Sequence, residues 1–476
     1  MKINKTHIFQ LIIGLIYMVS CSKDKGNYNY NMPTIPQVIG LDTLYEANVG
    51  DSLIIAPKYE DINSEDLECE WYIYVPEAID PDQYLYSGNS LRIIFGLQAK
   101  LYNARLTLTN KSTGIKYFHE FKIKGNTEFS KGTLVLSEED GISRLSFIKP
   151  NGEVQARIYE AINLKTLPSQ PQSIHYLSNK FTGNTPLAYW LIFKNEGIRI
   201  DVNNLRQEEI KPGTLRDNFF LAPENIEVAQ LKKYEQGILM GVINGKFYGG
   251  ITTTWDQANT YGMFGTYADG EYLLDKNFEI ININNSVSIL AFEKNKKQFI
   301  RFNLYGSPMY FGTQYSVLNS SIFDPTNLGS DIIHLTQVNN IDFYAYVKNT
   351  NGNIEELKFN LNFNGPFTFT PIHKRLFTNQ QILNEESKIV TTKTGVFYIA
   401  TENKLYRYTP LNQEIVEVEH KFTNNITMLK ISEDDQTLIV GSGNTLYYLN
   451  ISIGKNGNLL NKIEGIPGNT IDIAWR

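Results

Sequence analysis

Short runs in which apolar and polar residues alternate recur along almost the whole chain, and Gly, Asn and Asp residues separate them. Alternation with a period of two is typical of β-strands that bury one face, while Asn and Gly suit the tight turns between strands. After the first twenty residues, no long stretch repeats with the 3.6-residue period of an amphipathic helix. The pattern therefore predicts an all-β protein built from hairpins in series.

Residues 34–125 are predicted to form a first domain. Its strands are expected within 45–57 and at 67–75, 91–95, 104–109 and 115–123. Trp71 lies at the centre of one strand and Cys69 alternates with it, which predicts that both side chains are buried. Five or more short strands around a buried tryptophan are typical of an immunoglobulin-like β-sandwich.

Residues 129–476 repeat an apolar strand, a polar turn and an aromatic-rich strand at intervals of roughly fifty residues. Seven such units are expected, at 132–148, 188–200, 237–251, 288–302, 343–359, 395–408 and 427–449. One unit cannot bury both of its faces, so the repetition predicts a β-propeller of about seven blades, with six or eight as alternatives. The segment 469–476 has no hairpin partner, and we expect it to close the ring by joining the blade that begins near Gly132. A stacked pair of β-sandwiches is the alternative architecture.

The first twenty residues differ from the rest of the chain. Lys2 and Lys5 precede an apolar run, Ile8–Val19, and a Ser-Cys pair ending at Cys21 follows it. This order is typical of a bacterial lipoprotein signal, so we predict a signal peptide over 1–20, lipid attachment at Cys21 and a flexible polar tether from there to residue 33. The run is shorter than the ~20 residues of a membrane-spanning helix. An ordinary secretory signal or a short membrane anchor is the alternative.

The charge of the chain restricts its binding partners, and its cysteine content restricts disulfide formation. The chain has 44 basic and 50 acidic residues, and loss of Lys2 and Lys5 with the signal makes it more acidic. A mildly acidic chain is not expected to bind nucleic acid or to dock on anionic lipid through a basic patch. Only Cys21 and Cys69 are present, so lipidation of Cys21 leaves Cys69 without an intramolecular partner. The fold must then depend on core packing.

Four segments together resemble a known family. They are CSKDKGNYNY at 21–30, VGDSLIIAP at 49–57, LECEWYIYV at 67–75 and LTLTNKSTGIKYFHEFKI at 106–123. This order resembles the PKD-like family of Bacteroidetes lipoproteins, densely over 18–125 and loosely through 148, although Asn29 stands where the family usually has an acidic residue.

The resemblance implies a location and partners. Such lipoproteins are similar to accessory components of starch-utilisation-type loci, anchored in the outer membrane and facing the cell surface, with the periplasmic face as the alternative. The implied partners are a TonB-dependent transporter and its substrate-binding lipoprotein lid.

No motif in the chain indicates a catalytic or metal site. HExxH, CxxC, GxSxG and phosphate-binding glycine loops are absent, and the six histidines are widely scattered. Acidic groups at 138–140 and 433–435 lie in predicted hairpin turns, where solvated carboxylates are ordinary. We therefore predict no catalytic residue, no metal ligand and no cofactor.

Two aromatic and amide-rich segments, 252–272 and 305–315, interrupt the strand pattern. Aromatic rings beside amides and hydroxyls can bind sugar rings or peptide side chains. The ligand-binding candidates are Trp255, Tyr261, Tyr267, Tyr310 and Tyr315. The alternative is that these rings pack between blades or cover the transporter lid.

Two functions are compatible with these features. The favoured hypothesis is a non-catalytic accessory lipoprotein that binds a glycan or peptide nutrient or scaffolds the importer complex. The alternative is a surface glycoside hydrolase or lyase, which two carboxyls ~5–9 Å apart in an aromatic-lined propeller funnel would indicate. The absence of any catalytic motif favours the first hypothesis.

Overall fold

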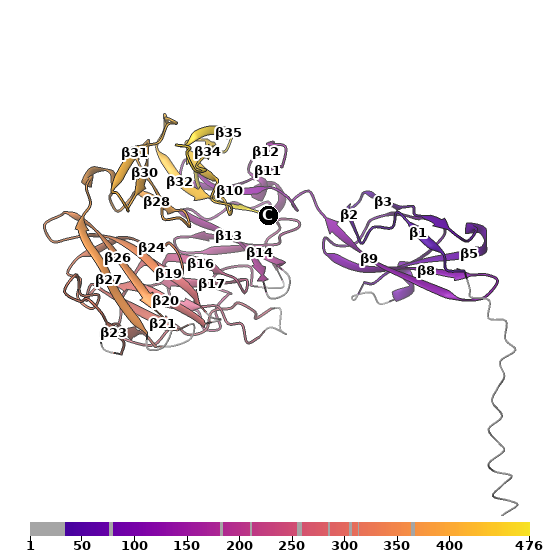
Figure 1. Cartoon of the computed structure of the whole chain (residues 1–476), viewed down its shortest axis with the longest axis horizontal. Coiled ribbons are helices and arrows are strands. Elements are labelled where there is room, and N and C mark those ends of the chain that lie inside the picture. The colour runs from indigo at the N-terminus through magenta and orange to yellow at the C-terminus, as the bar shows by residue number, and fades with distance from the viewer. Residues whose placement is uncertain are drawn as a thin grey trace, which may run out of the picture. The chain divides into compact units, whose positions relative to one another are not determined.

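The computed structural model describes most of the chain after residue 33. The described residues are 34–75, 80–180, 184–209, 212–254, 259–283, 286–303, 307–312, 314–362 and 367–476. They form two compact units, one ending at Gly125 and the other beginning at Asn126 (Figure 1). The predicted signal peptide, the tether and Cys21 lie outside the described residues. Among the residues that are described, no helix combines the length and the hydropathy needed to cross a bilayer.

The first unit is a β-sandwich. One sheet has the order β2 (Leu44–Asn48), β9 (Lys116–Asn126), β8 (Leu101–Asn110), β5 (Leu67–Ile73) and β6 (Leu85–Ser87). The remaining strands pair as β3 (Ser52–Ile55) with β7 (Leu91–Ile94), and as β1 (Gln37–Ile39) with β4 (Lys58–Glu60). Two short 3-10 helices, Ser64–Asp66 and Pro81–Tyr84, precede β5 and β6.

The core of the sandwich follows from the alternation along β5. Every second side chain of this strand is buried, and Trp71 is 0% exposed. Its indole N–H donates a hydrogen bond to the carbonyl oxygen of Gly88 at 2.8 Å, and its ring meets the edge of Phe121 at 5.9 Å between centroids. Cys69 is buried on the same face with a free thiol. The predicted burial of Trp71 and Cys69 is confirmed.

The second unit contains seven sheets within its described residues. Blade 1 consists of β10 (Thr133–Glu139), β11 (Ile142–Ile148), β12 (Val154–Gln155) and β36 (Asn469–Trp475). Blade 2 consists of β13 (Pro171–Asn179), β14 (Thr185–Phe193) and β15 (Gly197–Ile200), and blade 3 of β16 (Val228–Tyr234), β17 (Ile238–Ile243) and β18 (Lys246–Gly249). Blade 4 consists of β19 (Leu274–Ile283), β20 (Ser286–Glu293), β21 (Gln298–Asn303) and β22 (Met309–Tyr310).

The last three blades continue the series. Blade 5 consists of β24 (Asp331–Gln337), β25 (Asp342–Lys348), β26 (Ile354–Asn362) and β27 (Thr368–Leu376), with β23 (Ser316–Val317) parallel to β27. Blade 6 consists of β28 (Lys388–Thr391), β29 (Phe397–Thr401), β30 (Lys404–Thr409) and β31 (Glu414–Glu417). Blade 7 consists of β32 (Ile426–Ile431), β33 (Thr437–Ser442), β34 (Thr445–Asn450) and β35 (Asn458–Glu464). The short helices α2 (Ile158–Asn163) and Gln380–Ile382 lie before β13 and β28.

Middle strands of the blades bury both faces because each face meets a different neighbour. In β29, Phe397 and Ile399 join the cluster shared with blade 5, whereas Tyr398 and Ala400 join the cluster shared with blade 7. The side chains of a strand alternate between its two faces. Such strands therefore read as continuous apolar runs and can be stable only between two other blades.

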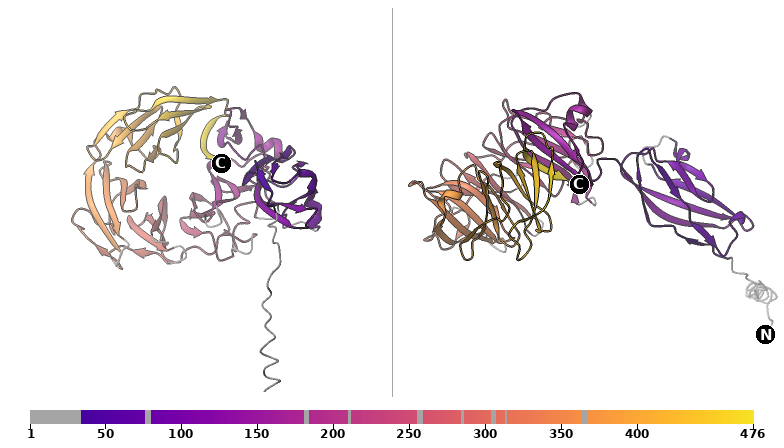
Figure 2. Two further views of the ribbon diagram at one scale, coloured as in Figure 1. Left: turned by 45° about the vertical axis from the view of Figure 1, so that its right-hand side comes forward. Right: turned by 90° about the horizontal axis from the view of Figure 1, so that it is seen from above.

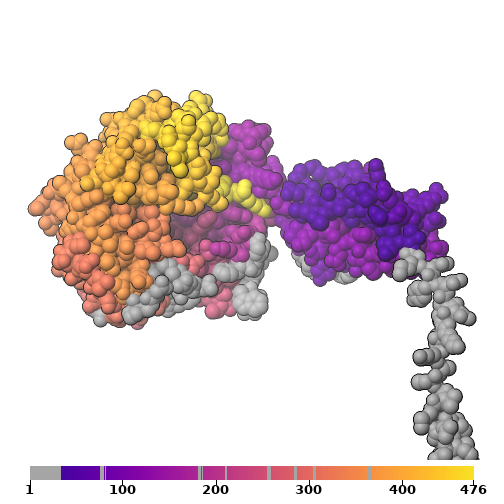
Figure 3. All heavy atoms as spheres, viewed as in Figure 1, coloured from indigo at the N-terminus to yellow at the C-terminus, as the bar shows by residue number. Residues whose placement is uncertain are grey.

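Strand β36 closes the ring. It pairs with β10 in antiparallel fashion, with Thr133 opposite Trp475. A hydrophobic cluster that includes Val135, Met428 and Ile473 joins blade 1 to blade 7, where the yellow residues of the chain adjoin the purple first blade (Figure 3). The predicted all-β fold, with a seven-bladed propeller closed by 469–476, is confirmed, and the alternative of stacked sandwiches is excluded.

Candidate functional site

The innermost strands of the seven blades surround a central channel. These strands are β13, β16, β19, β24, β28, β32 and β36, and the left view of Figure 2 shows the blades arranged around this axis. All seven strands contribute side chains to one cavity of about 660 Å³. Small-molecule sites commonly measure about 300–1,000 Å³. Because so many separate elements meet at this cavity, we treat it as the candidate functional site.

Two lysines at the channel are held by acidic neighbours. Lys232 Nζ lies 3.0 Å from Glu279 Oε2. Lys430 Nζ lies 2.7 Å from Asp472 Oδ1, and the other carboxylate oxygen of Asp472 accepts a hydrogen bond from the backbone N–H of Ile174 at 3.0 Å. Asp472 of β36 is therefore fixed between strands of blades 7 and 2.

Two further lysines line the cavity without such a partner. Lys276 of β19 and Lys388 of β28 form no ion pair with an acidic side chain in the part of the chain that the structure describes. Burial lowers the pKa of Lys388 below its usual value, the charge of Lys276 adds to the decrease, and Glu386 opposes it. The channel wall thus holds two cations that repel each other.

Two histidines face the same cavity from β13 and β24. Burial lowers the pKa of His175 to about 4, and nearby lysines add to the decrease while Asp472 opposes it. Burial also lowers the pKa of His334 to about 3, again with a contribution from nearby lysines. Both rings are neutral at pH 7, so each offers one N–H donor and one acceptor. Ser173 Oγ lies 2.9 Å from His175 Nε2, and their donor and acceptor roles depend on the tautomer.

Because these two histidines have lowered pKa values, we expect the propeller to become less stable as the pH falls. The unfolded chain takes up protons on His175 and His334 near pH 6.5, whereas the folded chain resists protonation until about pH 4 and 3. The unfolded state therefore binds more protons across this window, and stability falls as the pH is lowered through it. Thermal unfolding at pH 7.5 and pH 5 should show a smaller decrease in Tm for a His175→Gln, His334→Gln double variant than for the unchanged chain. Equal decreases would contradict the prediction.

Two of the three carboxylates that line the channel lie beside lysines. Asp472 is ion-paired with Lys430, and Glu385 Oε1 lies 3.7 Å from Lys348 Nζ. The described lining contains no Trp, Tyr or Phe, and no group of three or more His, Cys, Asp or Glu that could hold a metal ion occurs among the described residues. This wall offers charge and hydrogen bonds, which suit the capture of a polar ligand.

The aromatic candidates predicted from the sequence lie elsewhere. Trp255 is outside the described residues. Tyr261 and Tyr310 pack against the core between blades 3 and 4, and their hydroxyls donate hydrogen bonds to the carbonyl oxygens of Gln236 and Glu271 at 2.6 and 3.0 Å.

The remaining two tyrosines also have intramolecular contacts. Tyr315 packs edge-on against Phe367 at 4.6 Å between centroids, and Tyr267 is 44% exposed with the ammonium of Lys246 above its ring. None of the four described tyrosines lines the channel. Such packing is what the alternative interpretation of these rings predicts, and their role in ligand binding stays a prediction.

Sequence reasoning missed the channel for an identifiable reason. The repeated units were recognised by their apolar middle hairpins, and most innermost strands precede those hairpins as weaker patterns such as DIIHLTQ at 331–337. A basic residue or histidine recurs in these strands, as in Lys232, His334 and Lys430. This recurrence is the signal that could have located the site.

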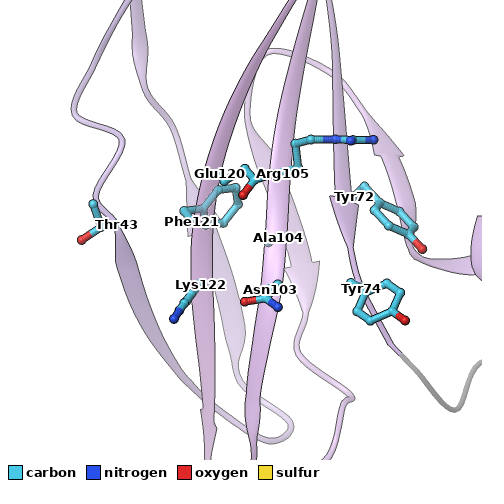
Figure 4. A pocket seen from close by; sticks show the side chains of 9 residues that line it. All are labelled: Thr43, Tyr72, Tyr74, Asn103, Ala104, Arg105, Glu120, Phe121 and Lys122. Atoms are coloured by element: carbon cyan, nitrogen blue, oxygen red, sulfur yellow. The ribbon is translucent and has the colours of Figure 1, made fainter.

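A second cavity, of about 470 Å³, lies on the outer face of the five-stranded sheet of the sandwich (Figure 4). Tyr72, Arg105 and Glu120 occupy one row across β5, β8 and β9, and Asn103 and Lys122 occupy the next. Opposite charges are adjacent in this register. The face is open, and Glu120 is the acidic residue of its lining beside the basic residues Arg105 and Lys122. One sheet and a neighbouring loop form it, whereas seven blades meet at the channel, so the channel is the better candidate.

Comparisons with known proteins relate both parts of the chain to others. A sequence model of the PKD-like family matches residues 21–171. No curated protein matches the chain. A quinonprotein alcohol dehydrogenase-like protein from Bacteroides thetaiotaomicron is similar in structure, with 14% identity and a TM-score of 0.44 over 92% of this chain and 99% of that one.

Two other solved structures are similar at the same level. The extracellular domain of a one-component system proposed in B. thetaiotaomicron has 10% identity and a TM-score of 0.39 over 79% of this chain and 55% of that one. The C-terminal WD40 domain of Sif2 has 10% identity and a TM-score of 0.42 over 72% and 89%. Likeness at this level assigns no activity to the chain.

Proposed function

We propose that this protein is a lipid-anchored accessory component of an outer-membrane importer, which captures a nutrient molecule in the central channel of its propeller. The observation that carries the proposal is the single polar cavity to which the innermost strands of all seven blades contribute. A cavity of this size can enclose a small ligand or one end of a longer one. A glycan or a peptide fits the role, because both present polar groups to lysine, histidine and amide side chains.

The location proposed for the protein is the cell surface. The basic residues, apolar run and Cys21 at the start of the chain support lipid attachment, and the match of residues 21–171 to the PKD-like family supports the same class of protein. The partners proposed are a TonB-dependent transporter and its substrate-binding lipoprotein lid. In this arrangement, the sandwich acts as a spacer between the anchor and the propeller.

Capture is better supported than hydrolysis as the role of the channel. A glycosidase needs one carboxyl group as an acid and a second as a base or nucleophile. In the described channel, Asp472 is engaged by Lys430 and by the backbone of Ile174, and Glu385 lies beside Lys348, so Glu386 is the one carboxylate of the described lining without an ion-pair partner. Groups held in this way position a ligand through charge, and a proton-transfer role would require them to exchange these partners.

The anchor and the partners can be tested together by replacing Cys21 with Ser. The unchanged protein, tagged and solubilised from native outer membrane, is expected to purify together with a TonB-dependent transporter and its lid lipoprotein. The Cys21→Ser variant is expected to leave the membrane fraction, because it lacks the acyl chains that hold it there. A Cys69→Ser variant is the matched control and should stay in the membrane. Recovery of the unchanged protein without any transporter or lid would contradict the accessory role.

A further inference from the structure

The cavity lining contains three lysines and three acidic residues, and three of these six side chains are engaged by partners outside the lining. The charged side chains in the lining are Lys232, Lys276, Lys388, Glu385, Glu386 and Asp472. Among the described residues, Lys232, Glu385 and Asp472 each have an oppositely charged partner. Lys276 and Lys388 do not, and Glu386 alone remains to oppose them. One side of the cavity is therefore cationic.

These cations come from strands that are close in the ring. Lys276 lies on β19 and Lys388 on β28, and His334 lies on β24 of the blade between them. All three residues line the same cavity, and the charge of Lys276 contributes to the lowered pKa of both Lys388 and His334. Two ammonium groups and a neutral imidazole from three successive blades thus line one cavity.

We infer that this side of the channel binds an oxyanion: a carboxylate, sulfate or phosphate group of the captured ligand. The inference rests on the proposed function and specifies the chemical class of its ligand. Ammonium groups form charge-assisted hydrogen bonds with such oxygens, and the imidazole can add an N–H donor. An oxyanion also relieves the repulsion between Lys276 and Lys388, because it places a negative charge close to both. A neutral ligand would leave this repulsion in place.

The test measures binding of four probes to the full chain in detergent by isothermal titration calorimetry. The probes are inorganic sulfate, inorganic phosphate, the acidic trisaccharide trigalacturonate and its neutral counterpart galactotriose. The acidic trisaccharide is expected to bind at least tenfold more tightly than the neutral one, since charge-assisted bonds are the stronger class. The inorganic ions are expected to bind weakly and to compete with the acidic trisaccharide. A higher salt concentration should weaken the binding of sulfate, phosphate and trigalacturonate, because it screens the charges.

Three substitutions locate the binding. Lys276→Gln and Lys388→Gln are each expected to lower the affinity for trigalacturonate about tenfold, because each removes one charged donor. Lys455→Gln is the matched control, since Lys455 is an exposed lysine in the turn between β34 and β35 and lies outside the cavity lining. The affinity of the Lys455→Gln variant for trigalacturonate should equal that of the unchanged protein. Thermal unfolding of each variant shows whether it is folded.

A fourth substitution changes the affinity in the opposite direction. Glu386 lines the cavity near Lys388, so Glu386→Gln removes a negative charge that repels an anion. Its affinity for trigalacturonate is expected to rise about threefold, as the nearby charge is removed. A damaged fold would lower the affinity instead, so an increase supports the inference independently of stability.

The outcomes separate this inference from the proposed function. Equal binding of the acidic and neutral trisaccharides, both weakened by a Gln172→Trp substitution that narrows the channel, would overturn the anion inference and leave channel capture standing. If trigalacturonate binds equally well to the Lys276→Gln and Lys388→Gln variants, the anion binds elsewhere and the inference is overturned. No binding of any anion would also overturn it, while importer association would still be decided by the Cys21 experiment.

Discussion

Deletion of residues 469–476 is expected to prevent cooperative folding of the entire second unit. These residues contain β36, the innermost strand of blade 1, and their loss leaves one edge of β10 without a partner. It also removes Ile473 from the cluster between blades 1 and 7, and Asp472 from its contacts with Lys430 and Ile174. The combined loss is on the order of the 5–15 kcal/mol that stabilises a typical domain. Limited proteolysis and near-UV circular dichroism should show an unfolded propeller.

Single substitutions provide a milder version of this experiment with a matched control. Ile473 is 0% exposed, whereas Ile453, in the turn after β34, is fully exposed. Ile473→Asp buries a carboxylate without a partner, which should cost several kcal/mol. Ile453→Asp should leave the Tm within a degree or so, since exposed substitutions rarely change stability by more than about 0.5 kcal/mol. If the deletion variant melted cooperatively at the original temperature, ring closure by β36 would not be essential.

Replacing Glu356 with Ala is expected to cost about 3–5 kcal/mol, the usual penalty for breaking a buried ion pair from one side. Glu356 is 0% exposed within blade 5, where its Oε1 lies 2.6 Å from Arg375 Nη2 and 2.9 Å from His373 Nε2. Its other oxygen accepts hydrogen bonds from the hydroxyls of Tyr408 at 2.6 Å and Tyr346 at 3.4 Å. Removing the carboxylate leaves the hydroxyls of Tyr346 and Tyr408 without this acceptor, and it leaves the guanidinium of Arg375, which also donates to the carbonyl oxygen of Pro410, without its charged partner.

The adjacent residue on the same strand serves as the control. Glu355 points to the opposite face of β26 and forms a partly exposed ion pair with Lys374 at 3.2 Å. Glu355→Ala should cost about 1 kcal/mol or less, as partly exposed pairs contribute little. Urea unfolding gives both values from the shift in midpoint at constant slope. Equal costs for the two variants would show that the Glu356 network adds no more than an ordinary surface pair.

The features that could be predicted from the sequence are those with local causes. Asn244 and Gly245 form the turn between β17 and β18 with φ values of 53° and 68°, the left-handed conformations that an Asn-Gly pair favours. The burial of Trp71 follows from the alternation within a single strand. The closing role of residues 469–476 could be predicted because this strand is left over once the other strands are assigned to hairpins, so it must pair with a strand that is distant in sequence.

The candidate site could not be predicted in the same way, because its residues meet only through the ring. Lys276 and Lys388 lie in different blades, and neither stands in a motif with the other. The Glu356 network likewise combines β26, β27 and β30 with Tyr346 of β25. In contrast, the segments around Tyr261 and Tyr310 have an unusual aromatic composition, which suggested a binding site. Both side chains pack against the core between blades 3 and 4. Composition identifies unusual segments, whereas charge balance depends on three-dimensional proximity.

The pairing of β10 with β36 has a consequence for the order in which the propeller forms. Thr133 and Trp475 are separated by almost the whole unit, so we expect this pairing to form after the intervening blades are arranged and to complete the ring. Contacts of this kind are slow to form, because the entropy of closing the long loop is lost before the contact gives any stabilisation. Until then, β10 presents an unpaired edge that strands from other chains can join. Blade 1 is thus both the first blade along the sequence and the last to be finished, and the interval between these two events is when the chain is most exposed to misassembly.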